Sequence, residues 1–171
     1  MGERRLFLLR HAKASWSRDA DHERPLAPRG ERVLPGVGLA IDGLLERPLD
    51  LVLASTAARV RATLAGVLPR LSPPHDVRWQ RSLYLADVDT LFGELRELPG
   101  ATRDVLLCGH NPGLHELALA LLSNDEGSSK LDDGLPPAGL VVIDIADDWA
   151  DVDAGSGTLV AYVTPPTEAA R

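Results

Sequence analysis

Short apolar runs alternate with helix-like segments along this chain, and that alternation constrains the fold more than any other feature. Strands are predicted at residues 5–10, 50–54, 77–80, 104–108, 140–145 and 158–163. Helices are predicted at residues 28–46, 56–68, 87–98 and 112–123. Strands that alternate with helices favour a mostly parallel sheet covered by helices on both faces. We therefore expect one α/β domain in three layers over residues 1–164, followed by a flexible C-terminal tail at 165–171.

The composition excludes several classes of protein. A net charge of −7 argues against a dedicated nucleic-acid-binding protein, whose surface should be strongly basic. The lone Cys108 rules out an intramolecular disulfide, and no apolar run is long enough to cross a membrane. A signal peptide is not expected, because Arg10 interrupts the first apolar run after four residues. We expect a cytoplasmic protein that contacts neither nucleic acid nor membrane, and the sequence leaves its oligomeric state open.

The charge is unevenly distributed along the chain. Residues 1–85 carry 14 basic and 9 acidic side chains, whereas residues 86–171 carry 4 and 16. Almost all the basic residues are arginines, which codon usage alone can explain or which can serve an anion site, since a guanidinium binds phosphate through two hydrogen bonds. The aspartates at 144–153 are interpreted as a solvated face, with shaping of the electric field as the functional alternative.

Three predicted strands end in polar residues that are capable of chemistry. Arg10-His11 follows the first strand, Ser55 to Arg59 follows the second, and Gly109-His110-Asn111 follows the strand at 104–108. The carboxyl ends of parallel strands meet at one edge of a sheet, where ligands of such folds bind. The sequence therefore predicts that two histidines and two arginines, separated by about a hundred residues, come together there.

Each of these residue types suits the handling of phosphate. An arginine at the end of a buried strand must reach solvent or find an anion. A neutral histidine offers a nucleophilic nitrogen near pH 7. Ser55 or Thr56 is expected to cap the second helix, so that Arg59 lies in its first turn beside the free N–H groups. Asn111 is expected to cap the helix that begins at Pro112.

These three motifs, in this order and spacing, resemble the histidine phosphatase superfamily. The form Arg10-His11-Ala12-Lys13-Ala14, the segment Glu23-Arg24-Pro25-Leu26 and the sequence Gly-His-Asn-Pro at 109–112 are similar to its small SixA-type phosphohistidine phosphatases. The similarity runs from about residue 5 to 122. It departs from the usual pattern in one place, because Ala12 stands where most members have glycine. The resemblance implies a phosphoglycerate mutase-like fold.

The resemblance also assigns roles to particular residues. It implies that His11 is the nucleophile that is transiently phosphorylated, and that Arg10, Arg59 and His110 hold the transferring phosphoryl group. Arg24 would add a phosphate contact, and Asn111 is included among the substrate-binding residues. No metal or cofactor is expected, and the five-residue spacing of His110 and His115 does not suit two ligands on one helix face.

The insertion that supplies a general acid in larger relatives is not evident between residues 64 and 109. Asp87 is the nearest candidate for that acid, although it also suits the cap of a helix. Without an acid, the leaving group must depart easily, and imidazole does so more readily than an alkoxide. We therefore expect hydrolysis of phosphohistidine on a protein. The alternatives are a small-molecule phosphomonoesterase of the same superfamily and a non-catalytic phosphate-binding module.

Overall fold

The computed structural model describes residues 4–73 and 76–166. One six-stranded sheet lies at its centre, with strand order β3-β2-β4-β1-β5-β6. The strands are β1 (Arg4–Arg10), β2 (Leu51–Ser55), β3 (Val77–Gln80), β4 (Asp104–Gly109), β5 (Leu140–Ile145) and β6 (Gly157–Val163). The longer helices are α1 (Pro28–Leu44), α2 (Ala58–Val67), α3 (Val88–Arg96) and α4 (Gly113–Leu121).

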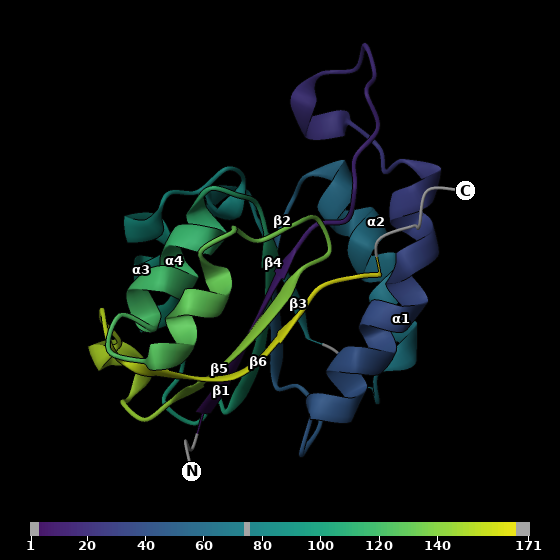
Figure 1. The fold of residues 1–171 in the computed structure, drawn as a ribbon. Coiled ribbons are helices and arrows are strands. Elements are labelled where there is room, and N and C mark those ends of the chain that lie inside the picture. Colours follow the sequence, from purple (N-terminus) through teal and green to yellow (C-terminus); the bar gives the residue numbers. More distant parts are fainter. Residues whose placement is uncertain (1–3, 74–75, 167–171) are drawn as a thin grey trace.

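The sheet is mostly parallel, and one strand, β5, runs against the direction of the others. Strands β3, β2, β4 and β1 pair in parallel, while β5 runs antiparallel to β1 and to β6. Helices α1 and α2 cover one face of the sheet and α3 and α4 cover the other (Figure 1). The predicted α/β fold with three layers is therefore confirmed. Part of the predicted tail, residues 167–171, lies outside the described residues.

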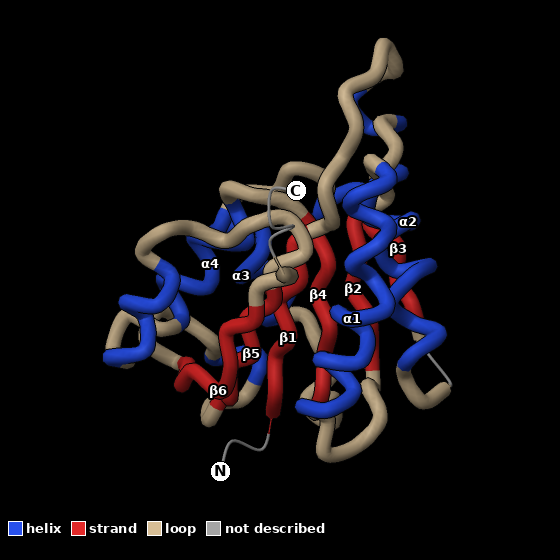
Figure 2. The backbone as a smooth tube through the Cα atoms, turned by 45° about the vertical axis from the view of Figure 1, so that its right-hand side comes forward, coloured by secondary structure: helices blue, strands red, loops and turns tan. Residues whose placement is uncertain are grey.

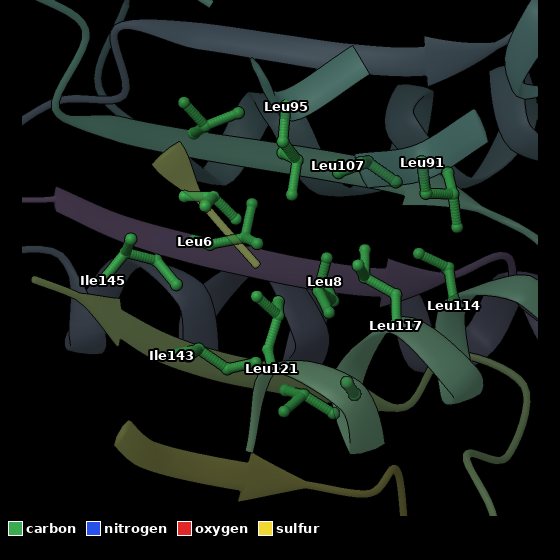
Figure 3. Packing of buried hydrophobic residues seen from close by; sticks show 14 of the residues in the cluster. Leu6, Leu8, Leu91, Leu95, Leu107, Leu114, Leu117, Leu121, Ile143 and Ile145 are labelled. Atoms are coloured by element: carbon green, nitrogen blue, oxygen red, sulfur yellow. The ribbon is translucent and has the colours of Figure 1, made fainter. Parts of the chain in front are cut away.

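The alternation of side chains along β1 explains why both faces are covered. Leu6 and Leu8 point into the core beneath α3 and α4, whereas Phe7 and Leu9 point into the core beneath α1 and α2. All four side chains are fully buried. Figure 3 shows the first of these cores, in which leucines of α4 pack between β1 and β5. A strand that is apolar on both faces must be sandwiched in this way.

Four of the five aspartates at 144–153 are exposed, as expected of a solvated face, and two of the five form ion pairs with β1. Asp144 accepts two hydrogen bonds from the guanidinium of Arg5, and Asp148 accepts one from Arg4. Both arginines belong to β1, so the acidic segment pairs with the beginning of the central strand. Along the described residues, no helix is both long and apolar enough to span a membrane.

Candidate active site

The parallel register of β1, β2 and β4 brings the predicted site residues to one edge of the sheet. Arg10 is paired with Gly109, so His11 and His110 leave their strands side by side. Their imidazole centroids lie 5.2 Å apart, although the residues are far apart in the sequence. Arg59, in the first turn of α2, donates hydrogen bonds to both rings. The predicted meeting of the three strand ends is therefore observed.

His11 is held with one ring nitrogen available for attack. Its Nδ1 lies 2.7 Å from the carbonyl oxygen of Ala12, which can only accept, so Nδ1 carries the proton. Its Nε2 consequently bears a lone pair, and it accepts a hydrogen bond of 3.3 Å from Nε of Arg59. The side chain is almost fully buried. This tautomer is the one that a nucleophilic Nε2 requires.

His110 is fixed by hydrogen bonds on both sides of its ring. Its Nδ1 accepts from a terminal nitrogen of Arg59 at 3.3 Å, so its Nε2–H donates to Oγ of Ser55 at 2.8 Å. The sequence suggested Ser55 or Thr56 as the cap of α2, but Ser55 does not cap it. The N-cap is Ala57, which has no side-chain cap. The buried imidazole N–H of His110 requires an acceptor, and Ser55 supplies it.

Both imidazoles are neutral near pH 7. Burial is the main cause that lowers the pKa of His11 to about 4, and the positive charges of Arg59, Arg10 and Arg24 act in the same direction. Burial, followed by the charges of His11 and Arg59, lowers the pKa of His110 to about 3. Placing a positive charge in a buried position among three arginines is unfavourable. The resulting site combines fixed positive charge with an uncharged nucleophile.

Arg59 joins both histidines to the segment that follows β1. Its side chain is buried, and its terminal nitrogens donate to the backbone oxygen of Asp21 at 2.7 Å and to Oδ2 of Asp21 at 3.1 Å. Thr63, one turn further along α2, accepts from the N–H of Ala12 at 3.0 Å and donates to the carbonyl of Arg59. The helix that carries Arg59 is thus tied directly to the loop that carries His11.

Asp21 and Tyr84 belong to the site although the sequence analysis did not identify them. The hydroxyl of Tyr84 donates to Oδ2 of Asp21, and its ring lies edge-on to His110 with centroids 5.4 Å apart. The hydrogen bonds from Tyr84 and Arg59 hold the pKa of Asp21 below its usual range, so this carboxylate is ionised. Neither residue lies at a strand end. Only the folding of segment 11–27 over α2 brings Asp21 to Arg59, and no spacing in the sequence signals it.

Arg10 and Arg24 lie near His11, and each has an unsatisfied donor. Arg10 donates to the carbonyl of Leu135 at 2.9 Å, and Arg24 pairs with Asp21 at 3.4 Å. The Nε atoms of both arginines are buried without a hydrogen-bond partner among the described residues. A buried donor without an acceptor is costly, and an anionic oxygen would satisfy it.

Asn111 does not cap α4. It donates from Nδ2 to the carbonyl of Leu135 at 2.8 Å, and the N-cap position of α4 is taken by Pro112. The backbone of Leu135 thus receives both Asn111 and Arg10, which places the segment 124–137 against the edge of the site.

Asp87 caps helix α3, as one of its two interpretations predicted. Its side chain accepts from the N–H of Thr90 at 2.9 Å, and this bond lowers the pKa of its carboxyl. Cys108 is fully buried in β4, and burial raises the pKa of its thiol. Among the residues described, no cluster of three or more histidine, cysteine or acidic side chains could hold a metal ion.

Comparison with known proteins places this site in a family. No protein-family model matches the chain. An uncharacterized protein from Mycobacterium tuberculosis is 36% identical over 165 residues, covering 92% of this chain and 99% of that protein. A candidate phosphohistidine phosphatase SixA from Nakamurella multipartitia superposes with a TM-score of 0.83 and 30% identity, covering 96% of this chain and 97% of that one.

A second candidate phosphohistidine phosphatase SixA, from Agrobacterium tumefaciens, gives a TM-score of 0.80 at 28% identity. It covers 95% of this chain and 98% of its own. The similarity therefore extends over nearly the whole chain. The chain belongs to the histidine phosphatase superfamily and is a SixA-like phosphatase.

Proposed function

We propose that this phosphatase hydrolyses phosphohistidine on a protein through a phosphorylated His11. The observation that carries the proposal is a neutral His11 with three arginines nearby, at a site where the described residues include no carboxylic acid with a proton to give. Asp87, the candidate general acid, and Asp21, which contacts Arg59, both have a pKa below the usual range. Such a site stabilises phosphoryl charge but does not protonate a basic leaving group.

The first step transfers the phosphoryl group to His11. The lone pair on Nε2 forms a bond to phosphorus while the P–N bond to the substrate imidazole breaks, and the leaving nitrogen takes that electron pair. Negative charge spreads over the three equatorial oxygens, where Arg10, Arg24 and Arg59 provide positive charge without a metal. Nδ1–H of His11 keeps its hydrogen bond to Ala12, which supports the positive charge that develops on the ring.

The second step releases phosphate. Water attacks phosphorus, the bond to Nε2 breaks, the imidazole of His11 regains its lone pair, and the water loses one proton to solvent, so that hydrogen phosphate is released. His110 remains a neutral neighbour because Ser55 and Arg59 occupy its two nitrogens. The enzyme therefore returns to its starting state without a cofactor in either step.

The leaving group decides between phosphohistidine and phosphate esters. Imidazole is a weak base, with a pKa of about 6.5 for its protonated form, so it can leave phosphorus without a proton from an acid of the enzyme. An alkoxide is much more basic and requires a general acid. Because Asp87 is ionised and occupied as a helix cap, we expect sugar phosphates to be poor substrates.

A panel of substrates tests this proposal. The protein is incubated with free phosphohistidine, with a small phosphocarrier protein phosphorylated on its surface histidine, and with sugar phosphates, and released phosphate is measured. The His11→Ala variant should be inactive, whereas His115→Gln, altered outside the site, should retain activity. Rapid quenching in alkali, which preserves phosphohistidine, should trap phosphate on His11. Turnover of sugar phosphates alone would refute the proposal and favour a phosphomonoesterase.

A further inference from the structure

The segment between β1 and α1 projects beyond the edge of the sheet where the site lies. Residues 11–27 leave the layered domain and return to it, as the purple segment at the top of Figure 1 and the tan tube at the top of Figure 2 show. On this segment Trp16 is 94% exposed, whereas Trp149 is fully buried. An indole is costly to leave in water and is common at the centre of protein interfaces.

This segment, residues 11–27, is called the arm, and it is held in place at its base. An antiparallel bridge joins Ala14 to Leu26, and Ser15 donates its N–H to the carbonyl of Pro25 at 2.9 Å. The N–H of Ala27 also donates to the carbonyl of Lys13 at 2.8 Å. These bonds give the arm a fixed direction, so Trp16 is presented at a defined position relative to His11.

The base of the arm belongs to the phosphoryl site, while its tip lies beyond it. Asp21 and Arg24 reach back from the arm, where Asp21 binds Arg59. The guanidinium of Arg24 also lies over the ring of Trp16, 5.8 Å from its centroid. The arm is therefore continuous with the site, and a ligand that contacts Trp16 would adjoin the cation proposed to bind phosphate.

The exposed side chains of the arm identify the kind of ligand. Trp16 is the large apolar side chain that the arm exposes, and the exposed charges around it are of both signs: Lys13 and Arg18 with Asp19, Asp21 and Glu23. A phosphorylated small molecule held at His11 does not require a projecting indole, whereas a protein that presents its phosphohistidine to the site must pass close to the arm. We propose that Trp16 docks the phosphorylated protein itself, against an apolar side chain beside its phosphohistidine. This inference rests on the proposed function.

The test compares a protein substrate with a small one in the same variant. For Trp16→Ala we expect kcat/KM on the phosphocarrier protein to fall by about 30-fold, the size of an interface hot spot. With free phosphohistidine, kcat/KM should not change. Trp16→Phe should recover most of the loss, and Leu39→Ala, which removes an exposed apolar side chain from α1, should behave as wild type. Because Trp16 is exposed, the thermal midpoint should be unchanged.

Each other outcome overturns the docking proposal. Equal loss on both substrates would show that Trp16 acts on the pocket through Arg24, and no loss on either would show that the arm contacts nothing. A Trp16→Ala variant that changes the molar mass in solution would identify a second copy of the chain as the occupant. A wild-type enzyme active on free phosphohistidine but not on the carrier refutes docking and leaves P–N hydrolysis standing. Inactivity on both refutes the proposed function as well.

Discussion

Acidification should destabilise this protein because two histidines are buried in their neutral forms. His11 and His110 have a pKa of about 4 and about 3 in the folded chain, against about 6.5 in an unfolded one. Between these values the unfolded state binds more protons, so the free energy of unfolding falls as the pH falls. At pH 5 each histidine should cost about 2 kcal/mol, and the pair about 4 kcal/mol. That is a large part of a typical total of about 5–15 kcal/mol.

Urea unfolding followed by circular dichroism at pH 7 and pH 5 measures this difference. The His11→Gln variant, which leaves an acceptor for Arg59 but no titrating ring, should lose about half of the pH dependence. In the wild type, the NMR shifts of the carbon-bound ring protons of His11 and His110 should remain those of neutral imidazole at pH 5. The comparison between wild type and variant removes the contribution of carboxyl groups that titrate in both.

A wild-type stability that is equal at pH 7 and pH 5 would refute the reasoning, because burial would then not suppress protonation in the folded state. Titration of the His11 ring with a pKa of about 6.5 would also refute it, because burial would then not lower the pKa of this residue.

Four further predictions follow from the structure. Arg59→Lys keeps the charge but loses the fork that serves both histidines, so kcat should fall about 10²–10³-fold in single-turnover assays. Gly30→Ala should lower kcat by about 10²-fold, because its Cβ would lie 2.4 Å from the carbonyl oxygen of Lys13, next to the nucleophile loop. Gly36→Ala, in the same helix and with open space around it, should instead raise the free energy of unfolding by about 0.5–1 kcal/mol in urea titrations. Asp87→Ala should lower the thermal midpoint but leave kcat on phosphohistidine unchanged, and a loss of kcat would restore Asp87 as the general acid.

The sequence predicted the elements and the meeting of the strand ends because both follow from simple periodicities. Each predicted strand and longer helix is present within a few residues of its expected bounds. Parallel pairing then dictates that His11 and His110 leave the sheet together, whatever the details of the loops. What the sequence did not reveal is that β5 runs antiparallel to both of its neighbours, because an apolar run carries no sign of its direction.

Local capping rules failed at two positions where a tertiary partner competes for the side chain. Ser55 accepts from His110 and Asn111 donates to Leu135, so neither caps the helix that follows it. The sequence did not identify Asp21 and Tyr84 as site residues for a related reason. Their contact with Arg59 depends on how an irregular segment folds back, and no periodicity encodes that path.

The central position of β1 has a consequence for the order in which this protein can be made. Among the described strands, β1 comes first along the chain and pairs with β4 and β5, whose residues lie at 104–109 and 140–145. Until those segments have been synthesised, the apolar run Leu6–Leu9 has no neighbours in the sheet, and such long-range pairing makes folding slow and exposes a nascent chain to aggregation. His110 and the carbonyl of Leu135 arrive equally late. A ribosome-bound fragment that stops before residue 140 should therefore carry the nucleophile yet depend on chaperones, and phosphatase activity should appear only after β5 has been synthesised.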